Sequence, residues 1–309
     1  MSKAKLICMT PIKNEAWILD KFLAAASVWA DHIIIADQHS DDGSKEIALK
    51  YKKVIYIENN SKEFNEPERQ KLLITEARKI PGKKLLVALD ADEFISGDAF
   101  ESADWKEMIN AEPGTVFKFK WPFITNTFDK YWAGETAKMP FAYMDDGAEH
   151  VGSKIHSIRI PFPKHAKEQQ IHDFVVMHFM YTDWKRMQSK HRWYQCYERC
   201  EYPKKSVIAI FRRYNHMYRV RDSEKNIIPD SWFITYSKLA INLKSTVINQ
   251  SYYWDPLVDE MVKAYGKEYF KYIDLPNNNN WLLKYLRKTR GFEYLLIEKI
   301  FDKMFGGIK

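Results

Sequence analysis

The chain has 309 residues, 46% of them hydrophobic and 15% aromatic, so it can bury a sizeable core and is not a disordered chain. Its 48 basic and 41 acidic residues give a net charge of +7, which suits an anionic ligand but does not distinguish a nucleotide from a phospholipid surface or a nucleic acid. Three cysteines do not make a disulfide framework, and neither a signal peptide nor a long apolar run is visible, so we expect a cytoplasmic protein.

The first 110 residues alternate between short apolar segments and segments with helical periodicity. This alternation predicts right-handed crossovers and a largely parallel sheet with helices on both faces. In such a sheet, ligands bind beyond the carboxyl ends of the strands. The expected strands are residues 5–10, 32–37, 53–59 and 84–90, and the expected helices are residues 14–30, 44–51 (after a turn at Gly43) and 65–80.

The pattern changes after residue 110. Residues 115–123 alternate aromatic and lysine side chains, which predicts a half-exposed strand. Residues 154–162 and 174–180 are further apolar segments that we expect to be strands. From Asp183 onward the chain has a mostly helical pattern.

Acidic residues follow the predicted strands at the positions where a parallel sheet binds its ligands. Asp90 and Asp92 are two residues apart, so an extended backbone would place their side chains on the same side. Two such carboxylates can hold a hard divalent ion and leave positions for phosphate oxygens. An isolated Asp-x-Asp is also typical of an exposed acidic turn, so its meaning depends on the other segments.

Four segments, in order, resemble the family-2 glycosyltransferases, which have the nucleotide-sugar-binding GT-A fold. The family pattern is a strand ending in Pro-x-x-Asn-Glu, then Asp-x-x-Ser-x-Asp-Gly-Ser/Thr, a helix bearing Arg, and a strand ending in Asp-x-Asp. The order and spacing match over the first third of the chain. The matching residues are Pro11, Asn14 and Glu15; Asp37, Ser40, Asp42, Gly43 and Ser44; Arg69; and Asp90 and Asp92.

The resemblance implies a binding site for a nucleotide-sugar donor at the ends of the first two strands. Pro11, Asn14 and Glu15 would line this site, and Asp37 would contact the base or the ribose. The family often has a second Asp where this chain has Gln38, whose amide can still donate and accept hydrogen bonds at a base edge. We expect a UDP-sugar as donor, although the departure at Gln38 leaves the identity of the base open.

The resemblance also implies a diphosphate site with Mn²⁺ or Mg²⁺. Asp90 would lie near the ribose, Asp92 would ligate the metal, and the guanidinium of Arg69 would reach the phosphates. GT-A enzymes often complete this site with a His after a late strand, and His178 is the candidate here, with Lys190 as a phosphate partner. His178 is equally consistent with a hydrogen-bonded histidine in the core.

An inverting transfer also needs a general base for the acceptor hydroxyl. A loop that contains Gly supplies three candidates, Asp145, Asp146 and Glu149, each of which is equally consistent with an exposed acidic turn. His156 and Arg159 are candidate contacts to the acceptor.

The sequence therefore predicts an α/β enzyme of the GT-A type, with a mostly parallel central sheet, flanking helices and a helical C-terminal region. Residues 1–110 would bind the nucleotide-sugar, residues 111–200 would bind the acceptor and close the metal site, and residues 201–309 would form a helical extension. The predicted activity is metal-dependent, inverting hexosyl transfer in glycan or surface-polysaccharide synthesis. The expected partners are the donor and a glycan or lipid-linked acceptor, without nucleic acid.

Two alternatives remain open. A nucleotidyltransferase also uses acidic groups on an α/β sheet, but it usually needs a Gly-rich phosphate loop after the first strand, and residues 10–17 contain no glycine. A module that binds anionic membranes or polyanions is the other alternative.

Residues 281–309 favour membrane binding because they contain seven basic and three acidic residues. Apolar residues recur there at helical spacing, which indicates a helix at a membrane surface or, equally, a helix packed on the core. These apolar residues are Tyr294, Ile297, Phe301, Met304 and Phe305.

Overall fold

The structure is a computed structural model that describes residues 3–133, 138–276, 278, 280–290, 295–300 and 303. It has two compact units, and each is described by itself. The first comprises Met1–Thr182 and Ile227–Val247, and the second comprises Asp183–Asn226 and Ile248–Lys309. The predicted division at residues 110 and 200 separates functions rather than compact units, and it stays a prediction.

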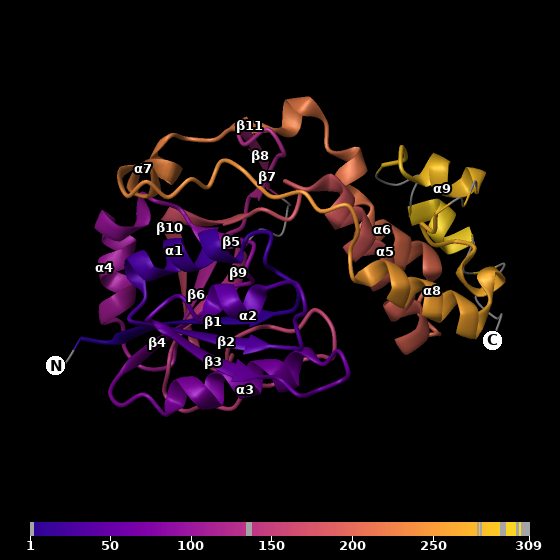
Figure 1. Cartoon of the computed structure of the whole chain (residues 1–309). Coiled ribbons are helices and arrows are strands. Elements are labelled where there is room, and N and C mark those ends of the chain that lie inside the picture. Colours follow the sequence, from indigo (N-terminus) through magenta and orange to yellow (C-terminus); the bar gives the residue numbers. More distant parts are fainter. Residues whose placement is uncertain are drawn as a thin grey trace. The chain divides into compact units, whose positions relative to one another are not determined.

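The first unit is built on a mixed sheet (Figure 1). Strands β4, β1, β2 and β3 are neighbours in this order and run parallel, as predicted. On the other side of β4, the order continues with β9, β6, β10, β7 and β8, and β9 runs antiparallel to both β4 and β6. The strands are β1 Lys5–Ile12, β2 His32–Asp37, β3 Val54–Glu58, β4 Lys84–Ala88, β5 Glu93–Ile95, β6 Thr115–Lys120, β7 Phe123–Ile124, β8 Lys130–Trp132, β9 Lys138–Met144, β10 Lys167–His178 and β11 Asn226–Ile227.

Helices cover both faces of the parallel strands because the strand interiors are apolar apart from the buried Thr10 of β1. Alternate residues enter two separate cores: Leu6 and Cys8 pack on the face of α1, and Ile7 and Met9 pack on the face of α3. The predicted α/β fold class is therefore confirmed. The helices of this unit are α1 Leu19–Trp29, α2 Ser44–Ala48, α3 Glu66–Arg78, α4 Ala103–Asn110 and α7 Ser231–Lys238.

Two predicted elements differ in the structure. Residues 154–162 form a loop rather than a strand, because Arg159 and the backbone of Ser157 bind side chains of neighbouring segments instead of a strand. Helix α1 begins at Leu19 rather than at residue 14, because the preceding residues form a loop in which Asn14 has a φ of 55°. Asn is one of the few residues that adopt this left-handed conformation readily.

Residues 227–247 belong to the first unit, although they are far from its other residues in the sequence. Their helix α7 buries Trp232, Phe233 and Tyr236 in the core that α1 also covers. The hydroxyl of Tyr236 donates to the carbonyl of Ile95 over 2.5 Å, which ties α7 to β5. A Cβ atom at Gly97 would lie 3.1 Å from the backbone of α7, so glycine permits this close approach.

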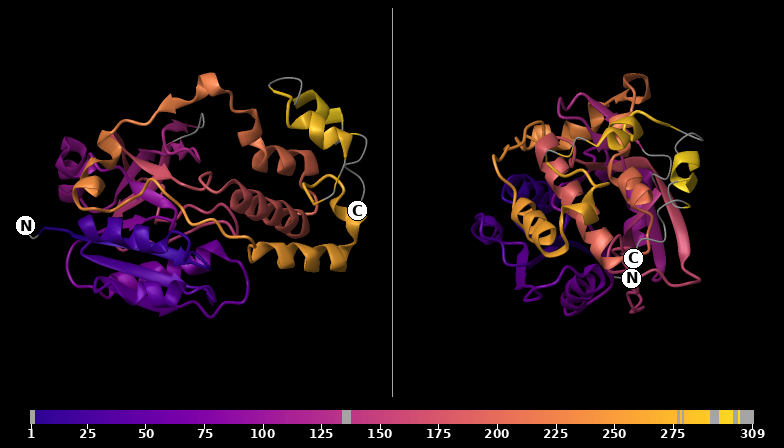
Figure 2. Two further views of the ribbon diagram at one scale, coloured as in Figure 1. Left: turned by 45° about the horizontal axis from the view of Figure 1, so that its top comes forward. Right: turned by 90° about the vertical axis from the view of Figure 1, so that its right-hand side faces the viewer.

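The second unit is helical, as predicted for this part of the chain (Figure 2). Glu198 is fully buried and accepts a hydrogen bond from Tyr214 over 2.8 Å, with Lys205 and Arg213 as ion-pair partners. No helix of the described residues has the length and apolar character needed to cross a membrane. The principal helices are α5 Trp184–Glu201, α6 Val207–Tyr214, α8 Trp254–Tyr265 and α9 Trp281–Leu286. Of the predicted C-terminal apolar residues, Tyr294, Phe301, Met304 and Phe305 lie outside the described residues.

Candidate functional site

The loops after β1 and β2 lie side by side at the carboxyl edge of the sheet, because Ile12 pairs with Asp37 in a parallel register. Hydrogen bonds join the two loops: the Asn14 backbone donates to Ser40 Oγ over 2.9 Å, and the Glu15 backbone donates to Ser44 Oγ over 3.0 Å. The backbone N–H of Ala16 donates to Asp42 over 2.9 Å. The residues of the two sequence motifs therefore fix each other and give this edge a defined shape.

Asp37 lies within this frame and is 2% exposed. Its carboxylate accepts hydrogen bonds from Ser40 Oγ over 2.6 Å and from Tyr56 Oη over 2.7 Å. Burial and the Asp37 carboxylate raise the pKa of Tyr56, so Tyr56 keeps its proton and remains a donor. The Gln38 amide donates to the carbonyls of Ser61 and Glu63, 2.9 Å away in both cases. Contact of Asp37 or Gln38 with a base stays a prediction.

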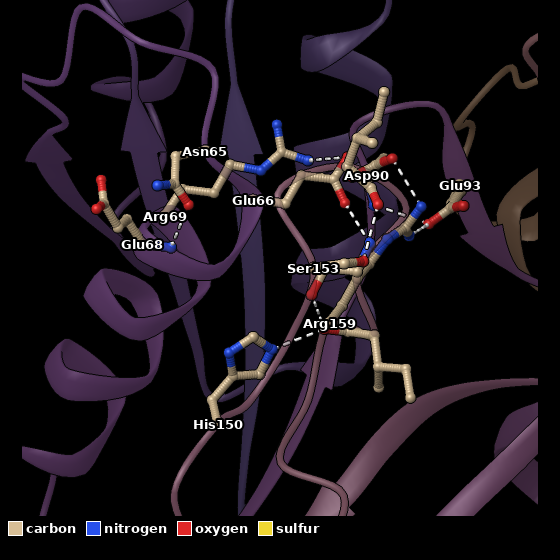
Figure 3. Close-up of polar contacts among 12 residues, drawn as sticks. Asn65, Glu66, Glu68, Arg69, Asp90, Glu93, His150, Ser153 and Arg159 are labelled. Carbon is tan, nitrogen blue, oxygen red and sulfur yellow. Dashed lines mark hydrogen bonds and ion pairs between the residues drawn. The ribbon is translucent and has the colours of Figure 1, made fainter. Parts of the chain in front are cut away.

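The carboxyl edge of β4 carries a charge network, only part of which the sequence predicts (Figure 3). Arg159 donates to Asp90 over 2.8 Å with one guanidinium nitrogen and pairs with Glu93 through the other. Burial raises the pKa of the fully buried Glu93 carboxyl, while Arg159 opposes this rise. Burial also disfavours the charge of Arg159, but Asp90 and Glu93 together raise its pKa. Glu93 directly follows Asp92, the second aspartate of the Asp-x-Asp motif. A third acidic residue at this position was the sequence feature that could have identified it.

The segment that carries Arg159 is held against the first turn of α3. Ser157 donates its backbone N–H to Glu66 Oε2 over 2.7 Å, and the Glu66 backbone donates to the carbonyl of Lys154 over 3.2 Å. Arg69 lies on the same helix, with its guanidinium 3.7 Å from Glu66 and 5.2 Å from the ring centre of Phe64 (Figure 3). The predicted Arg69 therefore lies on the helix that anchors the Arg159 segment, which in turn reaches Asp90.

His178 lies beside Asp92, as the sequence predicted for a shared site. Strand β10 pairs with β5 in antiparallel register, so His178 is opposite Glu93, and Phe179 donates its N–H to the carbonyl of Asp92 over 2.8 Å. The His178 Nε2 atom is 3.5 Å from Asp92 Oδ1, and the two side chains are 5% and 3% exposed. Residues far apart in the sequence are thus brought together by the sheet.

Aromatic rings fix the orientation of the His178 imidazole. The ring of Trp121 stacks on it with a centroid separation of 4.6 Å and an interplanar angle of 12°, and Phe123 lies 5.4 Å away. Within the described part of the chain, the Nδ1 atom of His178 has no hydrogen-bond partner. The imidazole is therefore held by packing, with Nε2 directed at Asp92.

The separation between Asp92 and His178 fits a divalent cation bound by both. Two ligand atoms about 2.1 Å from one ion lie about 3.0 Å apart at a right angle and about 3.4 Å apart at a tetrahedral angle. The observed 3.5 Å is close to these values and is long for a hydrogen bond. The local charge also suits a cation, because Asp90 and Glu93 share the single guanidinium of Arg159 and Asp92 adds a third carboxyl group at this edge.

The described residues contain no group of three His, Cys, Asp or Glu side chains positioned for a metal ion. A cation at Asp92 and His178 would therefore need further ligands from phosphate oxygens and water. Mg²⁺ in nucleotide sites is commonly bound in this way, by one or two carboxylates together with substrate phosphates.

The structure places the predicted general-base candidates Asp145 and Asp146 at the amino edge of the parallel strands, and their role as a base stays a prediction. Because β9 is antiparallel to β4, its end at Met144 lies opposite Leu85, at the amino edge of the parallel strands. Asp145 binds Arg78 there over 2.8 Å, and Asp146 pairs with the hydroxyl of Tyr143. This edge is about 16 Å from the ends of the strands that bear Asp90 and Asp92, at about 3.3 Å per strand residue.

The remaining predicted residues occupy other positions. Glu149 is exposed in the loop after β9, and His156 is exposed with a φ of 58°; their roles stay predictions. Lys190 belongs to the second unit, where its ammonium group lies 5.9 Å from the ring centre of Trp254, and its role at a phosphate also stays a prediction. Arg159 was predicted to contact the acceptor, whereas its guanidinium is engaged by Asp90 and Glu93.

No family model matches the chain, and no curated protein matches it. Among solved structures, it is similar to glucosyl-3-phosphoglycerate synthase from Mycobacterium tuberculosis, with 14% identity and a TM-score of 0.29 over 39% of this chain and 44% of that one. It is also similar to 4-diphosphocytidyl-2C-methyl-D-erythritol synthase, with 13% identity and a TM-score of 0.29 over 47% of this chain and 70% of that one.

A third similar structure is mannose-1-phosphate geranyltransferase from Thermus thermophilus, with 14% identity and a TM-score of 0.28 over 46% of this chain and 50% of that one. The match to the Mycobacterium tuberculosis synthase spans less than half of that protein. Similarity of this degree does not define an activity, and the activity of this chain must be inferred from its own residues.

Proposed function

We propose that the chain is a glycosyltransferase that moves a sugar from a nucleoside-diphosphate-sugar to an acceptor hydroxyl. The proposal depends chiefly on one observation, the approach of His178 to within 3.5 Å of Asp92 at the carboxyl edge of a parallel sheet. From the family resemblance we expected these two side chains to act together, although 85 residues lie between them in the sequence. Only the pairing of β10 with β5 brings them into contact.

Different residues of the chain would bind different parts of the donor. The frame around Asp37 would hold the nucleoside, with UDP as the expected carrier, and Arg69 would contact the phosphates with its guanidinium. Asp92 and His178 would hold Mn²⁺ or Mg²⁺, which supplies positive charge that stabilises the diphosphate as a leaving group. Asp90 would lie near the ribose, and Arg159 would keep its carboxylate in place.

We further propose that the transfer proceeds with inversion, from a hexosyl donor to a glycan or lipid-linked acceptor. An inverting enzyme needs a carboxylate or imidazole on the acceptor side of the sugar. Of the three predicted bases, Asp145 pairs with Arg78 and Asp146 with the hydroxyl of Tyr143, whereas Glu149 has an exposed side chain.

The reaction products distinguish this function from nucleotidyl transfer. We would incubate the full chain with a panel of nucleoside-diphosphate-sugars and Mn²⁺, and separately with nucleoside triphosphates and sugar phosphates. The proposal predicts release of a nucleoside diphosphate from one donor class, a requirement for Mn²⁺ or Mg²⁺, and loss of release on chelation. Release of pyrophosphate from a triphosphate would instead identify a nucleotidyltransferase. Binding of neither substrate class would contradict a donor site at this edge.

A further inference from the structure

The two units of the chain differ strongly in charge. The second unit, which comprises Asp183–Asn226 and Ile248–Lys309, carries 22 basic and 13 acidic residues, a net charge of +9. The first unit carries 26 basic and 28 acidic residues, a net charge of −2. The basic excess of the protein is therefore confined to a unit that contains none of the residues of the candidate metal site.

Helix α9 presents a mixed aromatic and basic stripe on its exposed side. Its inner side buries Leu283 and Leu286 against Ile208 and Phe211 of α6. Three outer residues follow the spacing i, i+3 and i+4, which places them on one face of α9, and a fourth lies in the turn just after the helix. They are Trp281 (74% exposed), Lys284, Tyr285 (44% exposed) and Lys288, and all four are exposed.

The helical residues 295–300 repeat this arrangement with aliphatic side chains. Ile297 on their inner side packs against the same cluster of α6 and α9 residues. The outer residues again alternate apolar side chains with lysine, and three of them occupy positions i, i+3 and i+4 of residues 295–300. They are Leu296 (46% exposed), Lys299, Ile300 (50% exposed) and Lys303, which are all exposed.

Two acidic groups in or near these segments have ion-pair partners within the unit. Glu298 pairs with Arg212 of α6 over 3.2 Å, and Asp274 pairs with Arg287. Both ion pairs engage carboxylates of the described residues near the two outer stripes.

We propose that the two outer stripes, Trp281-Lys284-Tyr285-Lys288 and Leu296-Lys299-Ile300-Lys303, form a docking surface for an anionic lipid bilayer. Trp and Tyr side chains favour the boundary between lipid and water, and lysine stems extend along apolar surface while their ammonium groups reach phosphate groups. Buried apolar area and attraction to anionic lipids together determine how strongly such helices bind. This combination favours a bilayer over a purely electrostatic partner, for which the exposed apolar residues would serve no purpose.

The surface would place the enzyme where acceptors with lipid anchors are found, but the inference does not depend on glycosyl transfer. It is tested by co-sedimentation of the full chain with vesicles of phosphatidylcholine containing about one third phosphatidylglycerol, and with vesicles of pure phosphatidylcholine. The wild-type protein is expected to bind the anionic vesicles and to bind the neutral ones much more weakly. Failure to bind the anionic vesicles would overturn the proposal, whatever the protein's catalytic activity.

Charge reversal locates the surface. The double variant Lys284→Glu/Lys288→Glu should weaken binding by about thirtyfold or more, because each lysine near an anionic surface contributes about fivefold in affinity. The matched control, Lys263→Glu/Lys267→Glu, makes the same change in net charge at exposed positions in and just after α8. An equal loss in the control would show that net charge alone drives binding, and would overturn the proposal.

Removal of the aromatic side chains tests whether the surface makes apolar contact with the bilayer or is held to it by electrostatic attraction alone. The double variant Trp281→Ser/Tyr285→Ser keeps every charge and should still lose most of the binding, since its apolar contact area is gone. Wild-type binding by this variant, together with equally strong binding to a soluble polyanion, would identify an electrostatic site for another ligand. All altered positions are exposed, so circular dichroism should show unchanged helix content.

Discussion

Two pairs of aspartates lie at opposite edges of the same sheet, and they differ in what surrounds them. Asp90 and Asp92 follow a parallel strand at its carboxyl edge, where Asp92 lies 3.5 Å from His178. Asp145 and Asp146 follow the antiparallel strand β9 at the amino edge, where they bind Arg78 and Tyr143. The two pairs of aspartates differ in role because the direction of the preceding strand determines the edge of the sheet at which each pair lies. The partners at that edge then decide whether its charge is already satisfied.

The largest contrast should appear in activity. Asp92→Asn is expected to reduce glycosyl transfer by about a thousandfold, because it removes a charge that holds the cation at the leaving group. Asp146→Asn is expected to change the rate by less than about twofold, since the residue lies at the other edge. Steady-state rates of both variants, normalised to folded protein, check this contrast. Equal rates for the two variants would abolish the distinction between the edges.

Arg159 is the partner that makes the carboxyl edge stable. Replacing it by Met is expected to lower the free energy of unfolding by about 3 kcal/mol, because the fully buried Glu93 loses its counter-charge. The double variant Arg159→Met/Glu93→Gln should recover part of this loss, because no uncompensated charge then remains buried. Urea unfolding of the wild type and both variants measures the difference, and a double variant less stable than the single one would refute this role.

At the amino edge, we expect a substitution of Asp145 to lower the stability of the fold without changing activity. Asp145→Ala removes the hydrogen bonds with Arg78 and should cost about 1–2 kcal/mol in the free energy of unfolding. Activity per folded molecule should remain that of the wild type. A loss of activity without a loss of stability would instead support a catalytic role for Asp145.

Much of the first unit followed from the sequence because its signals are local. The apolar run that forms β2, with the helix-forming segments around it, defines a parallel strand without reference to distant residues. The contact between His178 and Asp92 was expected only through the family resemblance, since nothing local requires it. The pairing of Arg159 with Glu93 was missed because the residues around Arg159 read as a strand. The edge reached by Asp145 depends on the direction of β9, and a sequence pattern does not encode that direction.

The central claim is that His178 and Asp92 share a divalent cation that binds the donor diphosphate. The most direct measurement is a calorimetric titration of UDP, with and without Mn²⁺, against the wild type and His178→Asn. His150→Asn is the matched control, because His150 and His178 are both buried, each with 4% of the whole residue exposed, and each has a ring nitrogen without a partner among the described residues. We expect Mn²⁺ to strengthen UDP binding by the wild type and by His150→Asn, and this gain to fall by about tenfold or more in His178→Asn. An equal loss of affinity in His178→Asn with and without Mn²⁺ would contradict the claim and leave His178 as a packing residue.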